Sequence, residues 1–309
     1  GFETMVKITD SAPVIIIEGD EYLASPIDRR PKFHLYHANI GVISGIAWDH
    51  INVFPTFVEY ISQFKKFIDT IIPTGKLIYC KNDTELREIV AKSDANIDKI
   101  SYAIPAHEVR DGITYLLPQG TPLQVFGNHN LMNLNAARLV CEELAINEDE
   151  FNKAIASFTG AAKRLELLNT KNQTSVYKDF AHSPSKLKAT IDAVKAQFAD
   201  RALVACIELH TFSSLNKEFL DQYRDTMNEA DFAVVYIDEK TFKHKKMDPL
   251  NEFDIQSSFN DKKIKFFTEA IDLEKYFRSL NFKNTNLLLM SSVNFGGMDL
   301  VKLASELNV

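Results

Sequence analysis

No run of apolar residues in this 309-residue chain approaches the roughly 20 residues that a helix needs to cross a lipid bilayer. The amino-terminal residues also lack the charged region, apolar core and cleavage site of a secretory signal peptide. From these two absences we expect no insertion into a membrane.

Blocks of basic residues are nearly absent as well. The formal net charge is -7, and the one short basic run, Lys243 to Lys246, is interpreted as a solvated loop. Proteins bind nucleic acids mainly through clustered lysine and arginine side chains that neutralise phosphates. The charge pattern therefore predicts no nucleic acid partner.

Cysteine is also scarce in this sequence. The three cysteines, Cys80, Cys141 and Cys206, stand far apart, show no metal-ligand spacing and lie in apolar surroundings. Such thiols are typical of buried cysteines in a reducing compartment, so we expect a cytoplasmic location.

The residues that are present suffice for about two globular domains, because 45% of them are hydrophobic. In the first half, short apolar runs alternate with longer amphipathic ones, which predicts a parallel sheet covered by helices. A small β meander is expected over 100–118, with a last strand at 123–125. The other expected strands are 14–17, 40–46 and 76–79, and the expected helices are 56–71, 84–91, 130–143 and 151–157.

A second series of strands and helices begins after Gly160, where the helical pattern stops. Apolar strands separated by helices predict a Rossmann-like α/β domain, although the glycine-rich dinucleotide fingerprint is absent. We therefore expect an α/β chain in two parts, 1–160 and 161–309. In the second part the expected strands are 175–180, 202–208, 232–237, 264–267 and 286–290, and the expected helices are 185–198, 216–227 and 272–280.

The stretch from Phe126 to Ala137 is the most informative in the chain. It places His129, Asn130 and Asn133 at the start of a predicted helix, and the two asparagines share one face because they are three residues apart. Such a cluster can bind the polar edge of a purine. The alternative is that these residues only cap and pack the helix start, where asparagine is favoured.

Carboxylates and histidines follow other predicted strands. Ile17 to Tyr22 is the end of an apolar run followed by three carboxylates, the first of them Glu18. Carboxylates at the carboxyl end of a buried parallel strand suit a Mg²⁺ ion that carries phosphates. Trp48 to His50 follows the next apolar run, and Lys178 to Pro184 follows a later one. Each segment also has a simpler interpretation, as a charged loop, a hydrogen-bonded histidine or a turn.

Taken in this order, the four segments resemble the signature of the Mur ligases, ATP-dependent enzymes that join amino acids or peptides to UDP-N-acetylmuramate. The resemblance covers nearly the whole chain. It implies that His129, Asn130 and Asn133 lie against the adenine of ATP, and that Asp179 and His182 lie near the ribose. The family commonly has His-His-Pro where this chain has His-Ser-Pro.

The same resemblance implies a magnesium site and a catalytic arginine. Glu18 and His50 would bind Mg²⁺ and assist catalysis, with Asp49 fixing the tautomer of His50. Arg164, in a Lys-Arg pair where the family has Arg-Arg, would approach the γ-phosphate when the domains close. Its simpler interpretation is a surface cation. Lys65 stands at the separation from His50 where some members carry a carbamylated lysine, but an ordinary solvated lysine is preferred here.

The incoming amine is expected beside His210, Ser213 and Asn294, which follow strands of the second part. Three segments resemble the members that attach the murein peptide L-alanyl-gamma-D-glutamyl-meso-diaminopimelate in murein recycling. The segment from Glu208 to Ser213 instead resembles the L-alanine-adding members. The substrates implied are UDP-N-acetylmuramate and a murein peptide, with L-alanine as the alternative. The three segments are Lys32 to Tyr36, Trp48 to Pro55 and Met290 to Gly297.

One element of the family is missing from these residues. No G-x-x-x-x-G-K-[ST] phosphate loop or near variant occurs, so no such loop can bind the β- and γ-phosphates through backbone N–H groups. We expect 1–160 to be the carboxyl-terminal portion of a central ATP-binding domain, 161–309 to be the ligase domain, and the UDP-binding domain to precede Gly1. Such a chain should not ligate alone. A folylpolyglutamate synthetase, whose folate loop is not evident, and a non-catalytic nucleotide-binding module are the alternatives.

Overall fold

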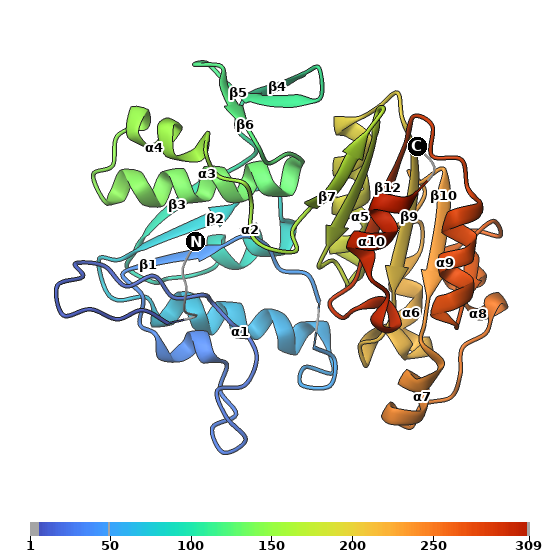
Figure 1. The fold of residues 1–309 in the computed structure, drawn as a ribbon. Helices are drawn as coiled ribbons and strands as arrows, with labels where there is room; N and C mark the ends of the chain where they lie inside the picture. Colours follow the sequence, from blue (N-terminus) through green and yellow to red (C-terminus); the bar gives the residue numbers. More distant parts are fainter. Residues whose placement is uncertain (1–5, 49, 308–309) are drawn as a thin grey trace.

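The computed structural model describes residues 6–48 and 50–307, which form three sheets (Figure 1). The prediction of an α/β fold with parallel sheets and covering helices is confirmed. The first sheet contains β1 (Ile40–Ile43), β2 (Lys76–Cys80) and β3 (Asp98–Tyr102); the second, antiparallel, contains β4 (His107–Arg110), β5 (Ile113–Leu116) and β6 (Thr121–Leu123); the third contains β7 (Glu166–Lys171), β8 (Thr174–Asp179), β9 (Ala202–Glu208), β10 (Phe232–Tyr236), β11 (Lys265–Phe267) and β12 (Thr285–Met290).

The α-helices of the described residues cover these sheets, and none of them is long and apolar enough to span a membrane. They are α1 (Phe57–Thr70), α2 (Thr84–Ala91), α3 (Asn128–Glu143), α4 (Glu148–Ile155), α5 (Pro184–Gln197), α6 (Lys217–Leu220), α7 (Glu239–Lys245), α8 (Glu252–Phe259), α9 (Ala270–Ser279) and α10 (Leu300–Glu306).

The first sheet is a central layer with α1 on one side and α3 on the other (Figure 1). Phe64 of α1, Ile78 of β2 and Ala136 of α3 belong to one buried cluster that spans these layers. Helix α1 begins with a capping box, in which the Thr56 side chain accepts from the backbone N–H of Glu59 and the Glu59 side chain accepts from that of Thr56. Local sequence therefore fixes where this helix starts.

The strand predicted at 14–17 is not formed. The segment has no strand pairing in the described residues, and its exposed fractions run from 42% at Val14 to 89% at Ile16. The segment does not pair with the edge strand β1, so its backbone groups have no partners from a neighbouring strand. Glu18 therefore follows exposed, irregular chain and not the end of a buried strand.

Two further predictions are corrected by the structure. The segment 101–104, expected to open the meander, overlaps β3, which pairs in parallel with β2; the meander is β4, β5 and β6. Apolar alternation predicts a strand but does not identify its partner. The basic run Lys243–Lys246 is the end of α7 and not a loop, because lysine is stabilised at the negative end of a helix dipole.

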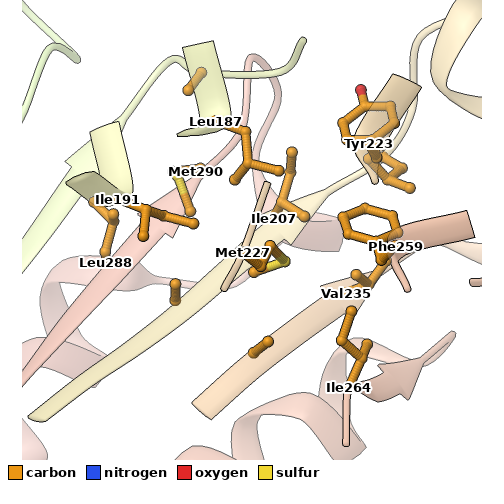
Figure 2. Close-up of a cluster of buried hydrophobic side chains, with 14 of the residues drawn as sticks. Leu187, Ile191, Ile207, Tyr223, Met227, Val235, Phe259, Ile264, Leu288 and Met290 are labelled. Atoms are coloured by element: carbon orange, nitrogen blue, oxygen red, sulfur yellow. The ribbon is translucent and has the colours of Figure 1, made fainter. Parts of the chain in front are cut away.

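The six-stranded sheet is the middle of three layers. Its order is β11-β10-β9-β12-β8-β7, and all neighbours are parallel except β7 and β8. Adjacent side chains point to opposite faces: Ile207 of β9 packs in the cluster with α5 and α8, and Cys206 in the cluster with α9 and α10. Figure 2 shows the first cluster, which includes Leu187 of α5, Phe259 of α8 and Leu288 of β12. The carboxyl ends of the parallel strands share one edge, where ligands commonly bind.

Polar and aromatic contacts join the region of the first sheets to the region of the six-stranded sheet. Gln197 at the end of α5 accepts a hydrogen bond from the Thr114 hydroxyl (3.0 Å) and donates to the carbonyl oxygen of Gly112 (2.6 Å). Trp48 lies edge-on to Phe219, with 6.2 Å between ring centroids. The chain itself crosses between α4 and β7. A domain boundary at residue 160 stays a prediction.

Candidate functional site

The predicted purine-binding motif lies at the amino end of α3, against α5. Gly127 is the N-cap residue with φ of 89°, and a Cβ atom there would lie 2.4 Å from that of Ala193, so only glycine fits. The side-chain amide of Asn130 donates to the carbonyl oxygen of Phe126 (2.9 Å) and fixes the turn before the helix. Asn133, one turn further along, is exposed.

Asp179 lies buried at the carboxyl end of β8, with 3% of its surface exposed. One oxygen accepts from the backbone N–H of Ala181 (2.7 Å) and, more weakly, from the hydroxyl of Thr190 (3.4 Å). The other accepts from the backbone N–H of Leu165 (2.8 Å). The carboxylate therefore attaches the segment before β7 to the end of β8, in addition to any contact with a ribose.

Arg164 precedes Leu165 and is exposed. Its guanidinium carbon lies 5.1 Å from the centre of the ring of Phe180, the residue after Asp179. A cation over an aromatic face at this separation is attracted by the ring quadrupole. The guanidinium thus lies over an aromatic ring while the residue stays accessible to solvent.

His129, in the first turn of α3, lies near Asp179 and Arg164. Burial has the largest effect on the pKa of His129 and lowers it, while the charge of Asp179 raises it and that of Arg164 lowers it. His129 is therefore within electrostatic range of both Asp179 and Arg164. The Nδ1 atom of His129 is buried and has no hydrogen-bond partner among the described residues. His182 is close by, since its ring lies edge-on to Phe180 with centroids 5.4 Å apart.

The residues predicted to bind magnesium, Glu18 and His50, are not arranged in the way that this prediction requires. The Nε2 atom of His50 lies 3.4 Å from Oε1 of Glu21, which also accepts a hydrogen bond from the Tyr60 hydroxyl (3.0 Å). Burial raises the pKa of Glu21, but the bonds with His50 and Tyr60 outweigh that effect and lower it to about 2. The contact of His50 is thus with Glu21, while Glu18 lies on the exposed chain before it. Asp49 is outside the described residues.

These residues do not fit a magnesium ion. Within 6–48 and 50–307, no three His, Cys, Asp or Glu side chains are grouped so that they could hold a metal. Mg²⁺ needs a set of oxygen ligands, whereas the carboxylate of Glu21 is already engaged by a histidine and a tyrosine. Lys65 is exposed on α1. The magnesium roles of Glu18 and His50 stay predictions that this arrangement does not support.

A cavity of about 500 Å³ opens at the carboxyl edge of the six-stranded sheet. Glu208, the last residue of β9, is one of its lining residues and accepts from the Ser291 hydroxyl (2.6 Å) and the backbone N–H of Phe295 (2.7 Å). Burial raises the pKa of Glu208. His210 also lines the cavity, and its Nε2 atom lies 3.0 Å from Oγ of Ser292. The cavity therefore has polar side chains among its lining residues, and it is bordered by the segments after β9, β10 and β12 and by α7.

The structure separates the predicted amine-binding residues. His210 and Asn294 both line this cavity, whereas Ser213 is buried in the 3-10 turn Ser213–Leu215 and is not a lining residue. A larger hollow of about 940 Å³ lies at the opposite edge of the same sheet, and no predicted site residue lines it. The smaller cavity is the better candidate because it contains the strand-end side chains.

Sequence reasoning missed several polar residues of this cavity, among them two carboxylates and a lysine. Glu208 ends β9, Asp238 follows β10, and Lys245 ends α7. The two carboxylates could have been found by a rule already applied to Glu18, that polar residues at the carboxyl ends of parallel strands share an edge. Lys245 had no such signal, because its position depends on the fold of α7.

No family model matches the chain, but curated proteins and solved structures do. A UDP-N-acetylmuramate–L-alanine ligase from Salinibacter ruber is 29% identical over 243 residues, 74% of this chain and 49% of that protein. The one from Caldicellulosiruptor bescii is 28% identical over 243 residues, 74% of this chain and 51% of that protein. The chain spans about half the length of the curated relatives it matches.

Solved structures share the fold. A murein peptide ligase from Psychrobacter arcticus matches 98% of this chain and 66% of its own, with a TM-score of 0.62 and 20% identity. A MurF ligase from Thermotoga maritima in complex with ADP matches 87% of this chain and 61% of its own, with a TM-score of 0.63 and 16% identity. A folylpolyglutamate synthase from Mycobacterium tuberculosis complexed with ADP matches 86% of this chain and 65% of its own, with a TM-score of 0.64 and 17% identity. The chain is thus similar in sequence to UDP-N-acetylmuramate–L-alanine ligases and shares its fold with these solved structures.

Proposed function

We propose that this chain contributes the nucleotide-facing and amine-facing residues of an ATP-dependent Mur ligase, which forms an amide bond at the lactyl carboxylate of UDP-N-acetylmuramate. The main supporting observation is that His129 lies within electrostatic range of both Asp179 and Arg164, and that Asp179 binds the backbone next to Arg164. The names of the relatives support the reaction class, and two of the solved neighbours contain ADP.

In the proposed reaction, a carboxylate oxygen of the sugar nucleotide attacks the γ-phosphorus of ATP, and ADP leaves with the bridging oxygen. The amino group of the second substrate then attacks the acyl phosphate, loses a proton, and inorganic phosphate leaves. Arg164 would stabilise the negative charge on the transferred phosphoryl group. His129, at the start of α3, would lie beside the adenine. These residues position the reactants and balance charge.

The cavity beside Glu208 is proposed to receive the amine. It presents the carboxylates of Glu208 and Asp238 together with Lys245, a combination that suits a zwitterionic amino acid or peptide end. Burial lowers the pKa of His210 to about 4, so its ring is neutral near pH 7 and does not repel an ammonium group. Asn294 adds a side-chain amide to the same lining.

Two amines compete for this role. A murein peptide is favoured because a cavity of about 500 Å³ is in the size range of sites for larger ligands and exceeds what L-alanine needs. The murein peptide ligase structure, which matches 98% of the chain, agrees with this choice. L-alanine is the second candidate, because the curated relatives are named as L-alanine ligases. The cysteines, all free, agree with the proposed cytoplasmic location.

The chain has no phosphate loop of its own, so we propose that it binds ATP weakly and does not ligate alone. Isothermal titration with ATP tests the nucleotide site. His129→Ala and Arg164→Ala should each weaken binding about tenfold, equivalent to ~1.4 kcal/mol. Lys163→Ala, which removes the adjacent exposed cation, is the matched control and should bind as the unchanged chain does.

Two results would count against these proposals. Equal affinity in the unchanged chain and in both site variants would reject the nucleotide site. ADP release in a mixture of the chain, ATP, UDP-N-acetylmuramate and either amine would reject the proposal that the chain is inactive alone, and mass spectrometry of the product would then identify the amine. Binding without any ligation favours a nucleotide-binding module that needs a partner segment.

A further inference from the structure

The backbone that presents Arg164 is held in an uncommon conformation. Lys163 and Leu165, on either side of it, have φ of 59° and 46°, in the left-handed region that residues with a Cβ atom avoid. The N–H of Leu165 is bound by Asp179 at 2.8 Å, and that of Lys163 by Oε2 of Glu166 at 3.0 Å. The side chain of Leu165 is buried in the cluster around α5. The surroundings therefore hold this segment against its own preference.

Phe180 restrains the side chain of Arg164. Its half-buried ring lies 5.1 Å from the guanidinium carbon and is contacted at its edge by His182. A guanidinium that lies on an aromatic face keeps its N–H groups free for an anion, because these groups lie in its own plane. The same short segment after β8 thus binds the backbone of Leu165 through Asp179 and supports the neighbouring side chain through Phe180.

A buried nitrogen without a partner lies beside this cation. The Nδ1 atom of His129 has no hydrogen-bond partner among the described residues, and the ring is within electrostatic range of Arg164 and Asp179. One ligand with a polar ring at one end and an anion at the other would satisfy both groups. A nucleoside phosphate has this chemistry.

We propose that Phe180 is a positioning residue, which holds the guanidinium of Arg164 toward the terminal phosphate of ATP and gives the site its preference for ATP over ADP. This inference rests on the proposed nucleotide site. Phe180 acts only through Arg164 and touches no reacting atom. The bond from Leu165 to Asp179 acts in the same direction, because it fixes the backbone from which Arg164 extends.

Nuclear magnetic resonance of the arginine Nε–H groups in the full 309-residue chain tests the proposal in two steps. The signal of Arg164, identified by its loss in Arg164→Lys, should be shifted upfield by the ring beneath it. The shift should disappear in Phe180→Leu and remain in Phe180→Tyr, which restores a ring. Phe253→Leu is the matched control, since Phe253 is 77% exposed on α8.

The same signal is then followed during titration with ATP and, separately, with ADP. The unchanged chain should bind ATP more tightly than ADP, and Phe180→Leu should reduce that ratio about fivefold, equivalent to ~1 kcal/mol. Phe180→Tyr should retain the ratio, which a loss of general stability would not explain.

The outcomes separate the two proposals. If the upfield shift is present but neither nucleotide binds, the proposed function fails and the role toward phosphate fails with it. If both nucleotides bind but Phe180→Leu keeps the ratio, or if Arg164 shows no ring shift, the positioning role is overturned while the nucleotide site stands. A shift and a ratio that both depend on the ring support the proposal.

Discussion

Asp179 shows how much one buried carboxylate can organise. It receives backbone N–H groups from Leu165 and Ala181, which belong to two separate segments, and a third bond from Thr190 of α5. Buried donors of this kind are costly when they lose their acceptor. The residue therefore influences both the stability of the fold and the place from which Arg164 extends.

Asp179→Asn should lower the free energy of unfolding by about 2–3 kcal/mol, because the amide keeps the shape but turns an NH₂ donor toward a backbone N–H. Urea denaturation measures the change. Asp192→Asn on the same α5 is the control: its ion pair with Lys188 is exposed, so it should cost less than about 0.5 kcal/mol. Equal midpoints for the two variants would contradict this prediction.

The lowered pKa of Asp231 leads us to expect that the stability of the protein depends on pH. Burial raises its pKa, but bonds from Lys195 (2.6 Å) and the backbone N–H of Leu203 (2.8 Å) outweigh that effect and hold the pKa below its usual value of 3.8. A carboxyl group with a lower pKa in the folded state stabilises the protein above the unfolded value and loses this contribution as the pH falls below it.

Asp231→Asn should therefore cost about 1 kcal/mol at neutral pH, a modest amount because the pair is partly exposed. The difference from the unchanged chain should shrink as the pH falls below about 4. Urea denaturation at a series of pH values measures it. A difference that stays constant into acid would show that the carboxylate charge contributes nothing.

At the scale of elements, Glu208 connects the end of β9 to the segment after β12. The bonds that it accepts from Ser291 and from the backbone of Phe295 fix the part of the chain that presents Asn294 to the cavity. The side chain of Glu208 thus connects the segments that follow β9 and β12, which are neighbours in the sheet but distant in sequence, and both segments line the cavity.

Glu208→Ala should speed hydrogen exchange at the backbone amide of Phe295 by at least about tenfold, since that N–H loses its acceptor. Ser291→Ala removes the other partner of the same carboxylate and should have a smaller effect on this amide. Mass-spectrometric hydrogen exchange measures both. Unchanged exchange in Glu208→Ala would mean that other contacts hold the segment.

Sequence alone predicted the elements whose ends have local signals. Helix α2 has the predicted bounds Thr84–Ala91, with Asp83 as its N-cap residue, and β9 likewise matches 202–208. The antiparallel edge strand β7 was missed because its side chains are mostly exposed and give no apolar pattern. The helix predicted at 216–227 shortens to α6, followed by a 3-10 turn.

The residues of the candidate site also include some that were predicted from the sequence and some that were not. The convergence of His129, Arg164 and Asp179 was expected from family resemblance, and no local periodicity could have predicted it. Glu18 was misplaced because an apolar run predicts a strand only if a neighbour exists to pair with it. Glu208 could have been found from its place at the end of β9, but its bonds with the distant residues Ser291 and Phe295 have no local signal in the sequence.

At the scale of the whole molecule, the two sheet regions are coupled by a buried polar contact. Thr114 is 1% exposed and Gln197 is 7% exposed, and their hydrogen bond joins β5 to α5. Because water is largely excluded, each side chain depends on the other for a partner.

Thr114→Val should destabilise the protein by about 1–3 kcal/mol, because it leaves the side-chain oxygen of Gln197 buried without its donor. Thr114→Val combined with Gln197→Leu should cost less than the sum of the two single changes. Chemical denaturation of all four proteins completes the cycle. Strictly additive effects would show that the two side chains are not energetically coupled.

Trp48, the single tryptophan of the sequence, lies between these regions. Its indole N–H donates to the carbonyl oxygen of Phe54 (3.1 Å), while the centroid of its ring lies 6.1 Å from that of Phe57 and 6.2 Å from that of Phe219. All indole fluorescence of the protein therefore comes from one residue at the contact between the regions. Any ligand that moves one region against the other should change the emission wavelength and intensity, so the protein contains its own optical probe and needs no attached dye.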